Sequence, residues 1–593
     1  MSSRTRQWNC IGIFVAALAL CGSAARAAEA APAARELPAD RDQVVAELQD
    51  DTAPGVDRRL GPGYSAFHPD GGQPAPDIYL APTRQDPGGR PYQIGGPWTR
   101  SGGDFSSTQG QVLYVPDAPD TFPVDRVTIT EWSNNTWSEC PEPPWHGGFR
   151  PEPASRKWLQ ATAGKSPGLP RAIARGYGGW ANCGVVIFSH GLVATAGTVT
   201  ARGLEPTFQL PPSKLPTAVS VTNKSEFALV TVCDTRTHRG QLAVFAMQVN
   251  GKKTRFVHEW QDDSAWGLPS VGLFTDMKLL GYVDLPGIEF PTGVCAVGNH
   301  EGGRMNGRDG NAGLLREYDL ARQADRDVFL TGPNAGYSST TGFALVAGKY
   351  ENKVAFVNLR PLFQKVREMY FTTDANYRKT REAGKDPGQW PYTFEADPAW
   401  APQVVSVIDV PHPTAVLASL SGGADARALI ASLDGTLSVY TAGGLATGAA
   451  ANPADIKPVG QVRIGRNPTR LTYQKGSRDT VLACSRGDAE IEWVQYRGKG
   501  VTAPTVIRRL RDARLRDPVD LEVADTHGVE ASLVTVVDFL GRQVVNYRYS
   551  KVVFATQGGA RFGMGADGKA EFECGGVMEF PGKPFAVSAS NVN

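Results

Sequence analysis

Short apolar runs separated by polar turns recur through the C-terminal two thirds of the chain. In the clearest copy, between Asn467 and Tyr496, the runs cover 469–473, 480–484 and 490–496, and each is bounded by Gly, Asp, Ser or Lys. The first and third runs alternate apolar and polar residues, and the middle run is mostly apolar. This pattern is typical of short antiparallel strands rather than of helices.

Each unit opens with a proline that is followed three positions later by an apolar residue. Proline lacks the N–H that a central strand would have to donate, so it marks a turn or the first residue of a strand. The motif begins at Pro216, Pro291, Pro413, Pro468, Pro518 and Pro584. A strand–turn–strand pattern then starts near residues 227, 293, 342, 428, 480 and 532.

Four short strands that return with a base period of about fifty residues indicate a radial array of blades. Six blades follow from the copies above. A further blade, shared between 584–592 and 184–209, would close the ring by pairing the two ends of the domain. The sequence therefore predicts an all-β fold, a seven-bladed β-propeller of four-stranded antiparallel blades.

These blades resemble the YVTN or lactonase-like group of seven-bladed β-propellers, in which an apolar strand ends in a polar turn and a V-x-V-x-type strand follows. The resemblance is carried by 342–359, 428–440 and 467–496, and the repeats cover 181–593. It implies a fold rather than a chemistry, because proteins with such blades include enzymes, electron-transfer subunits and binding modules.

The first 27 residues have the features of a secretory signal peptide. Arg4 and Arg6 precede an apolar core at 11–20, and Ala25-Arg26-Ala27 is a small-x-small cleavage site. We therefore expect cleavage after Ala27 and a periplasmic or secreted protein. No later run approaches the ~20 apolar residues that cross a bilayer, so no transmembrane segment is expected.

Residues 28–180 do not show the repeat and are rich in Pro, Gly and Trp. We interpret this region as an N-terminal extension or strap with a few strands that packs against the propeller. A carbohydrate or protein contact through its tryptophans is the alternative. Two insertions, near 251–288 and 360–401, interrupt the propeller, and long loops on a rigid scaffold are where binding residues concentrate.

Charge and cysteines narrow the partners and cofactors. The chain has 61 basic and 60 acidic residues, so nothing in its charge suggests nucleic acid or an anionic membrane as a partner. Six cysteines remain after the signal peptide, which allows disulfides, with buried free thiols as the alternative. No C-x-x-C-H occurs, so covalent haem c is not expected. The cofactor is unknown, and a divalent metal is left open.

A glycine-rich polar loop at 298–313 is the first candidate site. His300 and Glu301 could supply acid–base chemistry, and Arg304, Arg308 and Asp309 could bind a ligand. No metal ligands are identified. The alternative is an elongated hairpin turn without chemistry.

A cluster of arginines before Pro518 is the second candidate. It consists of Arg508, Arg509, Arg511, Arg514 and Arg516. Guanidinium groups at this density could receive an acidic ligand or the carboxylates of a partner. The alternative is a solvated linker in which Asp512 and Asp517 balance the positive charge of the arginines.

The favoured function is a binding or scaffold module for a protein or a small-molecule/carbohydrate partner, and not an enzyme, because no catalytic constellation emerges from the sequence. The first alternative is a lactonase-like or metal-assisted hydrolase at the axial mouth, with His300 and Glu301 as its catalytic residues. The second alternative is a subunit of a periplasmic redox enzyme. The enzyme hypothesis predicts that Asp, Glu, His or Arg side chains converge along the central channel. The oligomeric state stays open.

Overall fold

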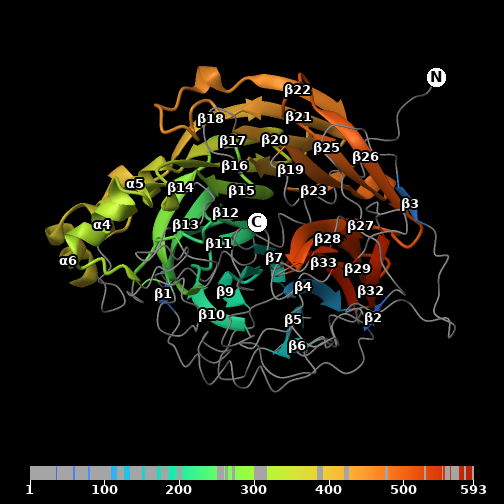
Figure 1. The fold of residues 1–593 in the computed structure, drawn as a ribbon, viewed down its shortest axis with the longest axis horizontal. Coiled ribbons are helices and arrows are strands. Elements are labelled where there is room, and N and C mark those ends of the chain that lie inside the picture. Colours follow the sequence, from blue (N-terminus) through green and yellow to red (C-terminus); the bar gives the residue numbers. More distant parts are fainter. Residues whose placement is uncertain are drawn as a thin grey trace, which may run out of the picture.

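The computed structural model is a ring of antiparallel sheets arranged radially around a central axis (Figure 1). It describes residues 35–36, 58–60, 78–80, 109–116, 126–133, 150–153, 170–174, 184–196, 204–249, 260, 265–269, 274–299, 317–382, 392–419, 426–473, 479–526, 529–549, 552–553, 561–562, 573–579 and 582–589. The predicted all-β propeller with four-stranded antiparallel blades is confirmed. Among these residues, no helix has the length and apolar character needed to span a membrane.

Six blades of the described ring each take their four antiparallel strands from one stretch of chain. The first three contain β7 (Pro170–Ala174), β8 (Gly184–Phe188), β9 (Leu192–Ala196) and β10 (Leu204–Gln209); β11 (Lys214–Val221), β12 (Phe227–Asp234), β13 (Arg239–Val249) and β14 (Phe274–Asp284); and β15 (Gly293–Gly298), β16 (Gly342–Gly348), β17 (Lys353–Asn358) and β18 (Gln403–Asp409). The next three contain β19 (Pro413–Ala418), β20 (Arg427–Ser432), β21 (Thr436–Thr441) and β22 (Pro458–Arg463); β23 (Pro468–Tyr473), β24 (Thr480–Ser485), β25 (Glu490–Gln495) and β26 (Thr505–Asp512); and β27 (Pro518–Thr526), β28 (Val529–Asp538), β29 (Gln543–Tyr549) and β32 (Glu573–Glu579). A small hairpin of β30 (Val552–Val553) and β31 (Arg561–Phe562) lies between β29 and β32 in the sequence.

A further four-stranded sheet joins strands from the N-terminal and the C-terminal parts of the chain. Its first strand, β33 (Gly582–Ala589), pairs antiparallel with β4 (Gln109–Pro116), which is followed by β5 (Arg126–Ser133) and β6 (Arg150–Pro153). The strand β33 also contacts β27 on one side and β7 on the other. The C-terminal strand therefore bridges the last and the first of the six blades.

The expected pairing of 584–592 with 184–209 is wrong. The strands β8, β9 and β10 already have a first strand of their own, β7, which pairs with β8. The segment Pro170-Arg171-Ala172-Ile173 is another copy of the opening motif, with an apolar residue three positions after the proline. The C-terminal strand pairs instead with β4, so strands from the region interpreted as a strap lie inside the ring.

Three short N-terminal strands lie on the outer edges of blades. The strands β1 (Arg35–Glu36) and β2 (Arg58–Leu60) pair antiparallel with β10 and β32, and β3 (Ile78–Leu80) pairs parallel with β26. A paired strand satisfies outer-edge N–H and C=O groups that would otherwise be open to another chain. This part of the extension therefore covers sheet edges, as a strap would.

In most units the opening proline coincides with a bulge at the start of the first strand; the exception among the described strands is β15, which pairs without a shift. In six first strands, the pairing register shifts between that proline and the second residue after it. Threonine often occupies the extra position, and Thr217, Thr414 and Thr469 each donate the Oγ1 hydroxyl to a carbonyl of the second strand at 3.2–3.4 Å. The bulge explains the motif, because the extra residue leaves the ladder where proline cannot donate.

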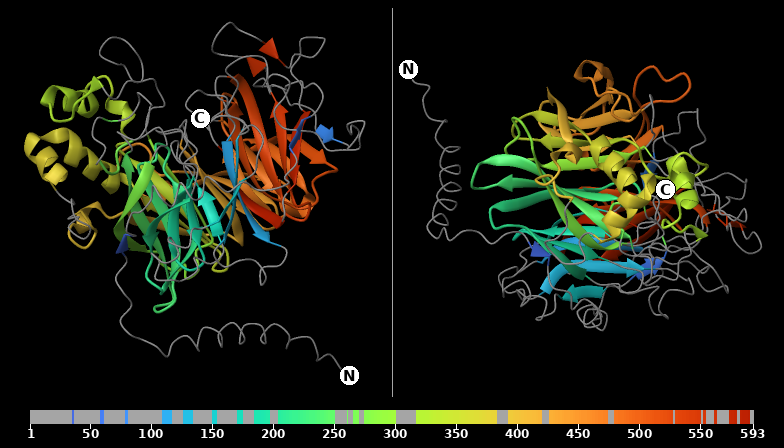
Figure 2. Two further views of the ribbon diagram at one scale, coloured as in Figure 1. Left: turned by 90° about the horizontal axis from the view of Figure 1, so that it is seen from below. Right: turned by 90° about the vertical axis from the view of Figure 1, so that its left-hand side faces the viewer.

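The insertions of the third blade build a helical lobe at one edge of the ring (Figure 2). It contains α4 (Gln323–Leu330), η4 (Ala335–Tyr337), α5 (Arg360–Arg367), the π-helix η5 (Glu368–Thr372), α6 (Asp374–Glu382) and η6 (Pro398–Trp400). Two further 3₁₀ turns lie elsewhere in the ring, η7 (Pro453–Asp455) and η8 (Arg486–Asp488). The helix α5, in the insertion predicted near 360–401, is amphipathic and buries Leu362, Phe363 and Val366.

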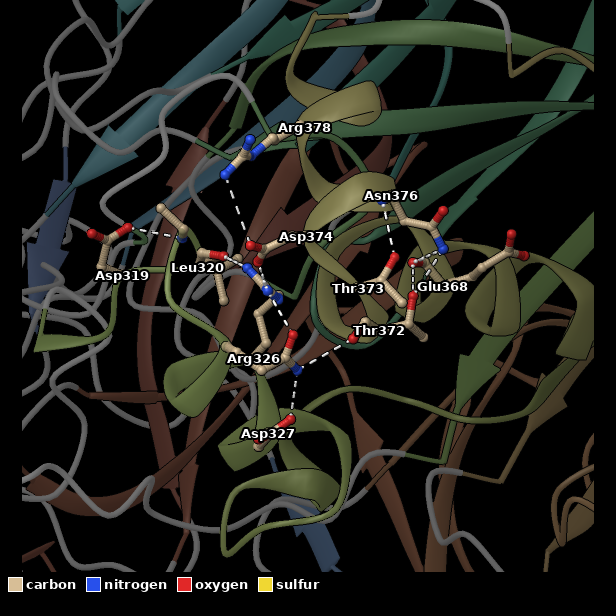
Figure 3. Close-up of polar contacts among 12 residues, drawn as sticks. Asp319, Leu320, Arg326, Asp327, Glu368, Thr372, Thr373, Asp374, Asn376 and Arg378 are labelled. Carbon is tan, nitrogen blue, oxygen red and sulfur yellow. Dashed lines mark hydrogen bonds and ion pairs between the residues drawn. The ribbon is translucent and has the colours of Figure 1, made fainter.

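A buried arginine holds the lobe together (Figure 3). The Arg326 guanidinium donates to the carbonyl of Leu320 at 2.7 Å, to Gln323 Oε1 at 2.6 Å and to the carboxylate of Asp374. These bonds tie α4 to α6 and to the chain that precedes α4. The aromatic loop after α6 packs inward as well, because Tyr392, Phe394 and Trp400 are buried. Its described residues, 392–400, therefore contribute to the core rather than to an open binding loop.

Gly281 in β14 allows this aromatic loop to dock. Its φ is +150°, and a Cβ added there would lie 2.6 Å from Phe394 Cδ2. The Phe394 N–H donates to the Leu280 carbonyl at 2.7 Å, which brings the ring against the strand. A side chain at residue 281 would therefore have both a strained backbone and a clash.

We expect Gly281→Ala to lower the free energy of unfolding by about 2 kcal/mol or more, through backbone strain and overpacking. The measurement is thermal melting followed by circular dichroism. Gly293→Ala is the matched control, because a Cβ at residue 293 would meet Ala347 Cβ at an ordinary 3.8 Å. Equal melting temperatures for the two variants would contradict this account.

Candidate functional site

The first strands of the sheets carry a common residue pattern near the axis, and two neighbouring strands break it. At the second position after the opening proline, most described first strands hold Ala or Gly. These residues are Ala172, Ala218, Gly293, Ala415 and Ala586. At the same position β23 has Arg470 and β27 has Asp520, and two residues later β27 has Glu522.

These three charged side chains meet between neighbouring blades. Arg470 Nε lies 3.4 Å from Asp520 Oδ1, and Arg470 Nη2 donates to Glu522 Oε1. Asp520 Oδ2 accepts the N–H of Val587, on β33, at 2.8 Å, and Oδ1 accepts the N–H of Leu521 at 2.9 Å. The contacts therefore join the first strands of three successive sheets.

The cluster is largely withdrawn from water, but it is not sealed. The exposed fraction of the side chain is 33% for Arg470, 13% for Asp520 and 7% for Glu522. Burial raises the pKa of Asp520 to about 6; the Arg470 charge opposes this shift, and the Glu522 charge adds to it. A carboxyl with this pKa exchanges a proton near neutral pH.

A buried hydroxyl lies beside the charged groups. Thr472 is two residues after Arg470 on β23, has 0% exposure, and its Oγ1 has no hydrogen-bond partner in the described part of the chain. Ser588, on β33, is 4% exposed, and its Oγ is likewise without a partner among the described residues. A buried hydroxyl without a partner costs roughly 1–3 kcal/mol, so it calls for a water or a ligand group as its partner.

In other first strands, the residues at the position of Thr472, four residues after the opening proline, have hydrogen-bond partners. Ser220 Oγ accepts the N–H of Ala296 at 3.0 Å, and Cys295 Sγ accepts the N–H of Ala418 at 3.3 Å. Each side chain thus satisfies an N–H of the next first strand. We refer to Arg470, Thr472, Asp520 and Glu522 as the axial cluster.

Sequence reasoning missed the axial cluster, although a signal for it was present. Aligning the units on their prolines places Arg470 and Asp520 where the other copies have Ala or Gly. Charged residues at a position that holds a small residue in the other units indicate that the packing near the axis differs there. The alternating carboxylates Asp520 and Glu522 would have given a second signal, because residues i and i+2 of a strand share one face.

The polar loop predicted as the first candidate site lies outside the described residues. This holds for His300, Glu301, Arg304, Arg308 and Asp309. Its acid–base and ligand-binding roles therefore stay predictions. The residue before it is described: Asn299 Oδ1 accepts the N–H groups of Thr340 and Thr341 at 2.8 and 3.1 Å. Asn299 lies at the C-terminal end of β15, the end of that strand opposite to its opening proline.

The five arginines are placed on and after the outer strand β26. Arg509 and Arg511 form ion pairs with Glu490, and Arg514 forms one with Asp512 at 2.9 Å. The Arg508 side chain is buried, with its guanidinium 5.8 Å from the centre of the Trp493 ring, and the Arg516 backbone N–H donates to Asp538. The structure does not bring the five arginines into the axial cluster, and their role in binding a ligand stays a prediction.

The described part of the chain contains no second candidate site built from cysteines or from potential metal ligands. Cys295 and Cys484 are free thiols. Among the described residues, no three His, Cys, Asp or Glu side chains lie together as metal ligands would. A divalent metal stays an untested expectation.

No protein-family model matches the chain, and no curated protein does. Solved structures similar to it include lactonase-like β-propellers. The periplasmic gluconolactonase PpgL of Pseudomonas aeruginosa is 11% identical over 82% of this chain and 100% of its own, with a TM-score of 0.38. A candidate 6-phosphogluconolactonase of Bacteroides fragilis is 9% identical over 82% of this chain and 98% of its own, with a TM-score of 0.40. The Cps50 (Swd1) β-propeller domain of Myceliophteria thermophila is 10% identical over 66% and 85%, with a TM-score of 0.33. The resemblance is one of fold.

The raised pKa of Asp520 predicts a pH dependence of stability. Between about pH 4 and pH 6 the folded protein binds this proton more tightly than the unfolded chain does, so this group makes stability fall as the pH rises through that window. The contribution is up to about 3 kcal/mol, from about 1.36 kcal/mol per pKa unit. We expect Asp520→Asn to flatten the dependence of the melting temperature on pH between pH 4 and pH 7. An unchanged profile would contradict the raised pKa.

Proposed function

We propose that the protein is an exported β-propeller that acts as a binding module for a small hydroxyl-bearing molecule of the carbohydrate class, held at the axial cluster. The observation that carries the proposal is the Thr472 hydroxyl, which is fully buried and without a described partner beside a guanidinium and two carboxylates. A ligand hydroxyl would supply the missing hydrogen bond.

The chemistry of the cluster suits several hydroxyl groups at once. Carboxylate oxygens of Asp520 and Glu522 accept hydrogen bonds from hydroxyls, and the Arg470 guanidinium donates to ring or hydroxyl oxygens. Hydrogen bonds to charged groups are stronger than neutral ones, which favours a polyol over an apolar ligand. Arg470 is one-third exposed, so the cluster can be approached from solvent.

Export is part of the proposal and rests on the sequence. A cleaved signal peptide is supported by Arg4 and Arg6, by the apolar run at 11–20 and by the small-x-small cleavage site Ala25-Arg26-Ala27. We also infer that the ring has seven blades, with the sheet of β33, β4, β5 and β6 as the closing blade. The contacts of β33 with β27 and β7 support this count.

The test is calorimetric titration of the purified mature protein with neutral sugars and polyols, using Thr472→Val as the key variant. This change keeps the shape of the side chain and removes the unpaired hydroxyl, so we expect binding to weaken at least tenfold while the melting temperature without ligand stays equal or rises. Ser220→Ala is the control, because the Ser220 hydroxyl already bonds the Ala296 N–H. Its affinity for ligand should match that of the unaltered protein.

Two results would overturn the proposal. One is the absence of binding for every neutral sugar and polyol tested. The other is equal binding by the Thr472→Val variant and the unaltered protein, which would leave a bound water as the partner of that hydroxyl and the charged trio as a purely structural link between blades.

Hydrolysis of a sugar lactone is the second candidate function, and the pKa of Asp520 favours it. A carboxylate with a pKa of about 6 can accept a proton from water as the water oxygen adds to the lactone carbonyl. Arg470 would stabilise the oxyanion that forms there. Cleavage of the ring C–O bond then returns the proton to the leaving alkoxide, so that one water is consumed for each hydroxy acid formed.

For this second function we expect acid release from a six-membered sugar lactone to be accelerated, with a rate that rises as the pH passes through about 6. Asp520→Asn should lower kcat at least a hundredfold, since a general base contributes typically 10²–10⁴-fold. The readout is proton release followed with a pH indicator. Activity that persists in Asp520→Asn would assign the reaction to other residues.

A further inference from the structure

The axial cluster has an excess of negative charge. One guanidinium, that of Arg470, faces two carboxylates, those of Asp520 and Glu522. Among the described residues, nearby groups from the other elements do not offset this excess. From β15 and β24 the neighbours are the thiols of Cys295 and Cys484, whose pKa values are raised by burial, so both are uncharged at neutral pH. From β33 the contact is a backbone N–H, that of Val587.

The charges that flank the cluster are engaged with other partners. Asp517, just before β27, accepts from Arg486 at 2.6 and 2.9 Å. Lys583, at the start of β33, has its ammonium 5.7 Å from the centre of the Phe539 ring. In the part of the chain that the structure describes, the charge balance near Thr472 is therefore set by Arg470, Asp520 and Glu522.

We infer that the ligand of the axial cluster carries a positively charged group, of the primary amine class, together with its hydroxyls. This inference rests on the proposed binding function and adds the ligand class. An ammonium between Asp520 and Glu522 would neutralise the second carboxylate and relieve the repulsion between the two. Its three N–H donors also match an acceptor-rich site.

A ligand of the opposite charge is disfavoured by the same geometry. A carboxylate or phosphate that approached Arg470 would come close to the two carboxylates that already form ion pairs with that guanidinium. Like charges brought together away from water repel strongly. The cluster therefore discriminates by charge as well as by hydroxyl content.

The experiment compares three open-chain probes of one length: 1-amino-1-deoxysorbitol as the cation, sorbitol as the neutral polyol and gluconate as the anion. Each is titrated calorimetrically into the full mature protein at pH 7.5. We expect the cation to bind at least tenfold more tightly than sorbitol, and gluconate to bind least. In Glu522→Gln, the preference for the cation should disappear.

A control and a pH series locate the effect. Glu490→Gln removes the same charge from β25, where Glu490 pairs with Arg509 and Arg511, and it should leave the preference intact. Lowering the pH from 7.5 to 5 should weaken binding of the cation, because Asp520 takes up a proton.

The outcomes separate this inference from the proposed function. Equal binding of sorbitol and the cation would overturn the inference and leave the binding function standing. A preference that survives Glu522→Gln would also overturn it, by placing the ammonium elsewhere. Failure of all three probes and of the neutral sugars to bind would overturn both.

Discussion

The taper of the blades towards the axis is the constraint on which the rest of the structure depends. The first strands of neighbouring sheets contact one another around the ring, so little room is left between them. Ala or Gly at the second position after most of the opening prolines meets this constraint, and a proline bulge sets the register of that position in six first strands. A large charged residue at that position must have a specific partner on the next strand. Arg470 and Asp520 are partners of this kind.

The fold could be predicted from the sequence because its signals are local and repeated. Alternating apolar runs, polar turns and an opening proline recur often enough to define strand number and blade period. The signal failed at Pro170, where one copy of the motif stands apart from the later ones and was assigned to the extension. Pairing between β33 and β4 could not be derived at all, since it joins segments separated by more than 450 residues and depends on the closure of the whole ring.

The candidate site was harder to predict for a physical reason. A binding cluster in a propeller draws one or two residues from each of several blades, so its members are scattered in the sequence and look ordinary one by one. The crowded residues that attract notice, such as the arginines at 508–516, lie on and after one outer strand, where acidic neighbours pair with several of them. Aligning equivalent positions across blades gives more information than local density does.

The sheet of β33, β4, β5 and β6 can be completed only late in folding, because its strands come from distant parts of the chain. Its three outer members are made among the first 153 residues, and its innermost member is made among the last twelve. Blades can form one by one along the chain, but the inner edge of β4 can be paired only after β33 has been made. Pairing with β33 is therefore the step that removes the exposed edge of β4, to which a misplaced strand could otherwise bind.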